Sequence, residues 1–324
     1  SQDITEYTPP KMLRQVPSVS DIADAARALL RAERPVLWAG AGVLFAGATE
    51  QLKVLAELTG TPVFCTMAGK SAFDERHSLA LGAGSGATTG PAHQWLQSCD
   101  LLMAIGSSLT RSPYAQRIRP DLFVIQNTNN PDEIGKDENV DIGLAGDAKL
   151  TLLALIDEVK GQMGTEPKNR HATEQEITRQ RAAWFRDWVA LLESDAVPLN
   201  TYRVIREIDR TLDRENSIVT HDAGAPRDSI VPFYTGTAPH SYIGWGKTTH
   251  LGFGIPLMIG AKLAHPEKFC LNLMGDGAFG MSGMDIETAV RAKTPITTVL
   301  LNNGGMATYP GGFPTAREKY GVSA

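Results

Sequence analysis

The sequence has few cysteines, no long apolar run and no excess of positive charge. Cys65, Cys99 and Cys270 lie far apart and form no CxxC pair, which predicts buried or free thiols in a reducing cytoplasm. No apolar run reaches the roughly 20 residues that a membrane-spanning helix needs. The N-terminal stretch SQDITEYTPPKML has no apolar signal-peptide core. The net charge of −5 indicates no general nucleic-acid-binding surface.

What is present is the composition of an ordinary globular protein. Hydrophobic residues make up 42% of the chain and charged residues 21%, and a length of 324 residues is enough for roughly two domains. Many glycines follow short apolar runs, as they do where the strands of α/β proteins turn into loops. The chain is therefore expected to fold as two doubly wound parallel-sheet α/β domains.

The first domain is predicted to cover residues 18–162. Residues 1–17 are polar and contain three prolines, as an interdomain linker does. From Ser20 the apolar residues follow a helical period, and short apolar runs then alternate with helical segments, which indicates a parallel sheet covered on both faces. The predicted strands lie at 36–40, 62–66, 101–106 and 122–127.

A second α/β domain is predicted over residues 178–324. Residues 163–177 lose the apolar period, and we expect a linker there. Helices near 178–193 and 199–213 precede a strand at 217–222. A glycine-rich segment then leads to two further apolar strands.

These last two strands are each followed by polar residues. Gly275-Asp276-Gly277 comes directly after the strand at 269–274, and Asn302-Asn303 comes after the strand at 296–301. A strand–helix–strand crossover returns in parallel, so both groups should reach the same edge of the sheet. Carboxylate and amide oxygens together with phosphate oxygens suit Mg²⁺, and the glycine turn lets backbone N–H groups approach an anion. The alternative is an ordinary crossover with a polar strand end.

This pairing of GDG with NN resembles the thiamine diphosphate (ThDP) motif of the pyruvate decarboxylase and acetolactate synthase superfamily. The resemblance implies that Asp276, the Asn303 side chain and the Gly305 carbonyl bind Mg²⁺. It also implies that the strand end at Gly275 and the N–H groups of Gly277 and Ala278 bind the diphosphate.

Two upstream segments extend the resemblance. HLGFGIP (250–256) is similar to the TMGFGLP of the family, in which a large apolar residue, here Leu251, bends the cofactor so that its own amino group can form the reactive C2 ylid. The Thr249 carbonyl would orient that amino group. HDAGAPRDS resembles the family's TDVG strand end and places the loop 223–225 (Ala223, Gly224 and Ala225) near the diphosphate. His221 and His250 are the candidate catalytic histidines, and the alternative for Leu251 and both histidines is a loop or core role.

The resemblance also implies missing parts. Family members carry an N-terminal pyrimidine-binding domain whose glutamate promotes ylid formation, and this chain is similar only to their central and C-terminal domains. We therefore expect an incomplete chain, or one member of a split assembly, that is inactive alone. Because the family site lies between subunits, a homodimer or homotetramer is expected.

The motifs point to two branches of the superfamily. AFGMSGMDIET resembles oxalyl-CoA decarboxylases and 2-hydroxyacyl-CoA lyases, whereas the central domain resembles acetolactate synthases. A lyase or carboligase acting on a 2-hydroxyacyl-CoA or a 2-oxo acid is expected, with an acetolactate-synthase-like carboligase of pyruvate as the first alternative. A non-catalytic nucleotide-binding protein is the second alternative.

The central domain of the family binds FAD, or the ADP group in the CoA enzymes. Its nucleotide strand usually ends in acids, but here it reads NTNNP (127–131), so Thr128 and Asn130 replace them. Arg111 follows a predicted strand and is a candidate for a nucleotide phosphate, with a solvated surface arginine as the alternative.

Overall fold

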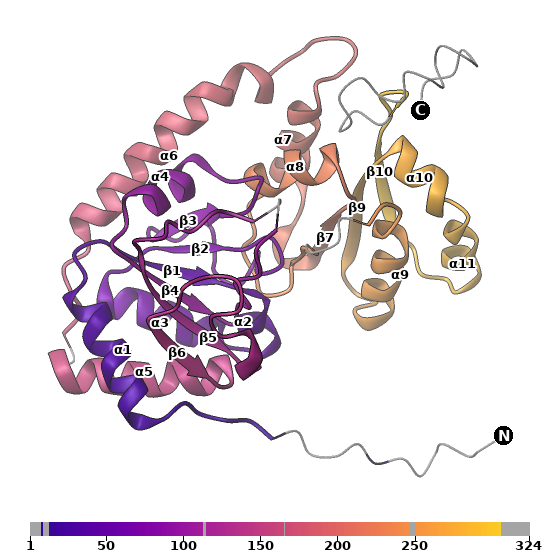
Figure 1. Cartoon of the computed structure of the whole chain (residues 1–324). Coiled ribbons are helices and arrows are strands. Elements are labelled where there is room, and N and C mark those ends of the chain that lie inside the picture. The colour runs from indigo at the N-terminus through magenta and orange to yellow at the C-terminus, as the bar shows by residue number, and fades with distance from the viewer. Residues whose placement is uncertain (1–7, 9–12, 113–114, 165, 246–249, 306–324) are drawn as a thin grey trace.

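Two parallel sheets, each flanked by helices, make up the fold (Figure 1). The computed structural model describes residues 8, 13–112, 115–164, 166–245 and 250–305. Thr249, most of the predicted linker at 1–17 and the segment 306–324 lie outside these residues. The α/β architecture predicted from the sequence is confirmed, and every strand pair in both sheets is parallel.

The first sheet has six strands in the order β3-β2-β1-β4-β5-β6. The strands are β1 (Pro35–Ala39), β2 (Val63–Cys65), β3 (Ala80–Ala83), β4 (Leu101–Ile105), β5 (Phe123–Thr128) and β6 (Ile142–Ala145). β1 and β4 are buried along nearly their whole length, which explains their continuous apolar sequences. The strand order reverses between β1 and β4, and such a reversal opens a crevice at the carboxyl ends of the strands.

Helices cover both faces of this sheet. α1 (Val19–Arg31), α3 (Thr49–Thr59) and α5 (Ala148–Met163) pack together on one face. α4 (Gly90–Ser98) lies on the other face, and two short helices, α2 (Ala41–Phe45) and η1 (Pro131–Glu133), follow strand ends. Ser18 begins α1 by accepting a hydrogen bond from the Asp21 N–H, and Gly60, with a φ of 67°, ends α3.

The second sheet has four strands in the order β10-β9-β7-β8. They are β7 (Ser217–His221), β8 (Tyr242–Ile243), β9 (Phe269–Gly275) and β10 (Thr297–Leu301). Its helices are α7 (Thr201–Thr211), η2 (Arg214–Asn216), α8 (Ala225–Phe233), α9 (Gly254–Ala264), α10 (Asp276–Ser282) and α11 (Asp285–Arg291). No helix within the described ranges is long and apolar enough to cross a membrane.

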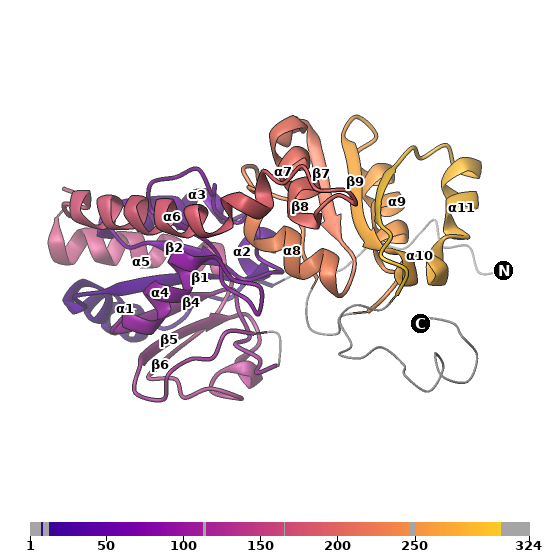
Figure 2. The ribbon, with the colours of Figure 1, turned by 90° about the horizontal axis from the view of Figure 1, so that it is seen from above.

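A single long helix, α6 (His171–Leu192), joins the two sheets. It packs against α4 of the first domain and α7 of the second (Figure 2). Near its end the Trp184 ring stacks on Phe233 at 4.9 Å between centroids. The second half of the linker expected over 163–177 is therefore helical. The sequence does not indicate this start, because the early residues of α6 are mostly polar.

A buried ion pair of the first domain lies at its contact with the second domain. The Lys70 ammonium contacts Glu75 at 2.6 Å, and their side chains are 1% and 9% exposed. Both residues belong to the first domain, but Glu75 also accepts the Gly236 N–H of the second domain at 2.6 Å. The Lys70 ammonium lies 5.5 Å from the centre of the Tyr242 ring. The second domain therefore contacts this buried pair directly, beside a hydrophobic cluster in which Met67 and Ala83 of the first domain pack with apolar residues of the second.

Candidate functional site

The predicted site residues meet at one edge of the second sheet. β10 pairs with β9 in parallel, with Leu301 opposite Gly275, so both strands end side by side. This confirms that the GDG and NN groups reach the same sheet edge. β7 lies on the other side of β9 and ends at the same edge.

A cavity of about 720 Å³ opens at this edge, and we call it the C-terminal-domain cavity. The predicted residues that line it are Ala223, Gly224, Ala225, Leu251, Gly275, Asp276, Gly277, Ala278, Asn303 and Gly305. His250 is exposed and is not part of the lining. The predicted residues therefore come from four separate segments of the chain and meet at one site.

Two helices begin at the cavity wall without a side-chain cap. α8 starts after Gly224, whose φ of 81° turns the chain away from β7. α10 starts after Gly275 at the end of β9. The first N–H groups of a helix have no partner within it, and they stabilise an anion where no side chain takes their place.

The side-chain oxygens of the cavity lining belong to one carboxylate, two amides and the Thr201 hydroxyl. Among the described residues, no hydrogen bond or ion pair involves the half-buried Asp276 carboxylate. The Asn303 side-chain oxygen accepts the Gly305 N–H at 3.2 Å, and Asn302 accepts the Gly304 N–H in the same way. No group of three His, Cys, Asp or Glu residues in the described part of the chain would hold a metal. A metal ion at this site would thus need amide, carbonyl and ligand oxygens in addition to Asp276.

Arg227 is a cavity residue that the sequence analysis missed. It lies in the first turn of α8, its side chain is only 6% exposed, and both its Nε and its Nη2 contact the Asp228 carboxylate at 2.7 Å. It brings a buried positive charge to the same wall as Asp276. Its place in HDAGAPRDS, directly after the glycine turn, was the available indication.

The α6–α7 connection also contributes to the wall. Pro198, Leu199 and Thr201 line the cavity, although they precede β7 in the sequence. No local motif marks these residues, because they reach the site only when α7 packs against α8.

His221 is buried and lies outside the cavity lining. Its ring stacks on Trp245 at 5.3 Å between centroids, and its Nε2 atom has no hydrogen-bond partner among the residues that the structure describes. Burial lowers the pKa of His221 to about 3, with a smaller contribution in the same direction from Arg227. The imidazole is therefore neutral at ordinary pH, and the structure gives it a core role.

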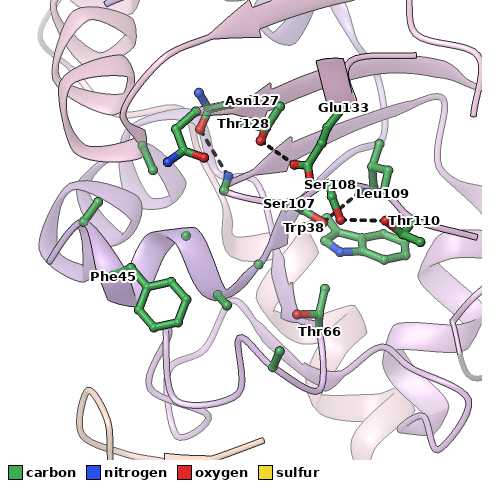
Figure 3. Close-up of a pocket in the computed structure, with 18 of the residues that line it drawn as sticks. Trp38, Phe45, Thr66, Ser107, Ser108, Leu109, Thr110, Asn127, Thr128 and Glu133 are labelled. Carbon is green, nitrogen blue, oxygen red and sulfur yellow. Dashed lines mark hydrogen bonds between the residues drawn. The ribbon is translucent and has the colours of Figure 1, made fainter. Parts of the chain in front are cut away.

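A second cavity, the central-domain cavity, lies beyond the carboxyl ends of β1 and β4 and has a volume of about 600 Å³ (Figure 3). Trp38 and Thr66 form part of its wall. Glu133 also lines it and accepts a hydrogen bond from the Thr128 hydroxyl at 2.9 Å. Within the described part of the chain, the buried Trp38 Nε1 donor has no hydrogen-bond partner.

The polar residues at and after the end of β5 have different roles: some stabilise the fold and others present polar groups to the central-domain cavity. Asn127 is fully buried, and its amide bonds to four groups: the Gly106 N–H, the Leu144 and Gly146 carbonyls and the Thr151 hydroxyl. Asn130 does not line the cavity, because its side chain caps η1. Glu133 instead provides a carboxylate beside Thr128. Arg111 also lines the cavity; it is 70% exposed and forms a bidentate pair with Glu138.

Comparison with known families agrees with this architecture. The family model "Thiamine pyrophosphate enzyme, central domain" matches residues 22–155, and the model "Thiamine pyrophosphate enzyme, C-terminal TPP binding domain" matches residues 222–321. Together the two models span more than half of the chain. The chain belongs to the family of thiamine pyrophosphate enzymes.

Its curated relatives include acetolactate synthases. A probable acetolactate synthase large subunit of Methanococcus aeolicus is 30% identical over 295 residues, covering 87% of this chain and 48% of the relative. An acetolactate synthase of Mycobacterium leprae is 30% identical over 305 residues, covering 90% of this chain and 46% of the relative. The acetolactate synthase isozyme 3 large subunit of Escherichia coli is 27% identical over 285 residues, covering 87% of this chain and 49% of the relative. The chain thus spans about half the length of the curated relatives it matches.

Burial of His221 predicts a specific pH dependence of stability. Its pKa falls from 6.5 to about 3 on folding, so between these values the unfolded chain takes up a proton that the folded chain does not. The free energy of unfolding should therefore decrease as the pH falls, by ~1.4 kcal/mol between pH 7.5 and 5.5 from this residue. In His221→Phe, which keeps the ring stack but cannot titrate, that part of the decrease should be absent.

Denaturant unfolding at both pH values measures this difference. His93→Gln, at an exposed site on α4, is the control and should change with pH as the wild type does. Equal pH dependence in the wild type and His221→Phe would contradict the assignment of a buried neutral imidazole.

Proposed function

We propose that the C-terminal-domain cavity binds thiamine diphosphate together with Mg²⁺. The observation that carries the proposal is the convergence of Asp276, Asn303 and two uncapped helix starts on one cavity. The lining suits the group chemically. A diphosphate needs N–H donors and a positive charge, and Mg²⁺ needs several oxygens.

Each part of the wall would have its own role. Asp276, Asn303 and the Gly305 carbonyl would hold Mg²⁺, and the N–H groups of Gly277 and Ala278 would bind the diphosphate. The loop 223–225 would lie beside the same phosphates, and the buried Arg227, which also pairs with the half-exposed Asp228, would offset part of their charge. Leu251 packs against the small core of Ile255, Met274 and Ala278 and would support the ring portion of the cofactor.

When bound, thiamine diphosphate supplies a nucleophilic carbon and an electron sink for breaking or forming carbon–carbon bonds. The residues of this chain bind and orient the group and keep its ring portion against an apolar wall. The Thr249 carbonyl, which lies outside the described residues, remains the proposed partner of the amino group. His250 is exposed beside the cavity loop, and we retain it only as a candidate that contacts substrate.

The reaction we propose is carbon–carbon lyase or carboligase chemistry on a 2-oxo acid or a 2-hydroxyacyl-CoA. Similarity to acetolactate synthases over both domains supports a 2-oxo acid such as pyruvate. The segment AFGMSGMDIET, which forms α10 and the start of α11, supports the CoA branch. Activity would also require a pyrimidine-binding domain, supplied by the same protein or by another chain, and a homodimer or homotetramer.

We further propose that the central-domain cavity binds an adenine nucleotide, either as ADP or as part of FAD or CoA. Glu133 would accept hydrogen bonds from the ribose hydroxyls. Arg111 and Arg14 are paired with acids, so the phosphates would depend on hydroxyl groups such as that of Ser107.

Removing the Asp276 carboxylate tests the metal and cofactor site. We expect Asp276→Ala to weaken Mg²⁺-dependent binding of thiamine diphosphate by at least about tenfold, since even outer-shell partners of a metal are worth that much. Titration calorimetry with and without Mg²⁺ measures the loss. Asp285→Ala, in the first turn of α11 and outside the cavity, should bind as the wild type does. Unchanged affinity in Asp276→Ala would contradict the site.

Two substrates separate the proposed reactions in an assembly that includes the pyrimidine-binding domain. Carboligation joins two pyruvates into acetolactate with loss of CO₂, whereas lyase action splits a 2-hydroxyacyl-CoA into an aldehyde and formyl-CoA. We expect product from one of the two, identified by mass spectrometry. Product from neither substrate would favour the remaining alternative, a non-catalytic nucleotide-binding protein.

Replacing Glu133 tests the nucleotide proposal. Glu133→Gln should weaken ADP binding by about tenfold, because hydrogen bonds to a charged acceptor are stronger than those to an amide. Asp132→Asn, an exposed neighbour in the same η1 turn that does not line the cavity, is the matched control. Equal ADP affinity in the wild type and both variants would reject the role of Glu133.

A further inference from the structure

The carboxylate of Asp222 joins three parts of the C-terminal domain. Asp222 directly follows β7 and is 0% exposed. Its Oδ1 accepts the Ala223 N–H at 2.8 Å and the Gly252 N–H at 3.0 Å, and its Oδ2 accepts the Gly254 N–H at 3.0 Å. Three backbone donors from two segments thus share one buried carboxylate.

Each donor belongs to a segment of the proposed cofactor site. Ala223 begins the loop 223–225 that lines the diphosphate end of the cavity. Gly252 directly follows Leu251. Gly254 is the first residue of α9, whose N-cap residue, Phe253, provides no side-chain cap. Asp222 therefore caps α9 from another strand, and its negative charge is favourable at a helix N-terminus.

The segment after Leu251 contains two glycines at positions that do not tolerate a side chain. Gly252 has a φ of 82°, which a residue with a side chain rarely adopts. A Cβ atom at Gly254 would lie 2.1 Å from the Asn272 Oδ1. These glycines let the backbone after Leu251 approach β9 closely, and Asp222 ties this segment to the end of β7.

We propose that Asp222 is a positioning residue that acts through Leu251. By holding the loop 223–225 and the Leu251 segment on one carboxylate, it fixes the distance between the diphosphate end and the ring end of the cavity. This inference rests on the proposed thiamine diphosphate function and assigns to Asp222 a role that the cavity lining alone does not show.

The variant Asp222→Asn disturbs the bond to Gly254, at the Leu251 end of the cavity, more than the bonds to Ala223 and Gly252. The amide keeps Oδ1, so the bonds from Ala223 and Gly252 can remain, but it places an NH₂ donor against the Gly254 N–H. Two probes then distinguish the ends of the cavity in titration calorimetry on the same chain. Inorganic pyrophosphate with Mg²⁺ reports the diphosphate end alone, whereas thiamine diphosphate with Mg²⁺ also reports the Leu251 end.

We expect Asp222→Asn to weaken thiamine diphosphate binding by roughly tenfold and pyrophosphate binding by less than about threefold. Leu251→Ala should show the same selectivity. Both changes act on the contact between Leu251 and the cofactor. The loss of thiamine diphosphate affinity in the double variant, Asp222→Asn with Leu251→Ala, should therefore be clearly smaller than the product of the two single-variant losses. Losses that multiply, or equal losses for both probes, would overturn the inference.

Asp209→Asn is the matched control. Asp209 is also buried in this domain and accepts a backbone N–H, that of Thr235 at 2.8 Å, but it does not line the cavity. Neither probe should change affinity in this variant. Hydrogen exchange should show faster exchange over residues 250–258 in Asp222→Asn and not in Asp209→Asn, and unchanged exchange in both would also overturn the inference.

Ligand binding by the wild-type chain distinguishes a failure of this inference from a failure of the proposed function. If the wild type binds no thiamine diphosphate in the presence of Mg²⁺, the proposed function fails and the inference fails with it. If the wild type binds both probes and Asp222→Asn shows no selectivity between them, only the role of Asp222 is rejected.

Discussion

The parallel pairing of β9 with β7 and β10 is the constraint on which the rest of the second domain depends. Its register places His221 opposite Leu273 and Leu301 opposite Gly275, so three strands end at one edge. The turns after these strands must then share the space beyond the sheet. Backbone groups in that space cannot all pair with each other, which leaves donors and oxygens for a ligand.

The charges at this edge are few and of both signs. Asp276 lies on the same wall as the buried Arg227, and two helices begin there without side-chain caps. A bare anion would meet the Asp276 carboxylate unfavourably, and a bare cation would meet Arg227 and the helix N-termini. An anion that carries its own divalent metal ion satisfies both halves of the wall, which is the physical case for a metal–diphosphate ligand.

Each sheet has its own cavity at the carboxyl ends of its strands. The buried Lys70–Glu75 pair lies at the contact between the two domains. Removing one partner of such a buried pair costs ~3–5 kcal/mol, whereas an exposed pair such as Arg291–Glu287 is worth less than about 1 kcal/mol. The buried pair is therefore worth more than the exposed one, and it also accepts the Gly236 N–H of the second domain.

The sequence by itself determined seven of the ten strands in the described part of the chain, the fold class and the order of the GDG and NN groups, because apolar runs and glycine turns reflect burial and backbone shape locally. It missed the short strands β3, β6 and β8. It did not place the start of α6, whose early residues are polar because few of them are buried, or show that Glu133 rather than Asn130 serves the central-domain cavity. Only the tertiary structure joined Asp222 to Gly252 and Gly254, some thirty residues away. Partners of buried charges are chosen by packing between distant segments, and no local pattern encodes that choice.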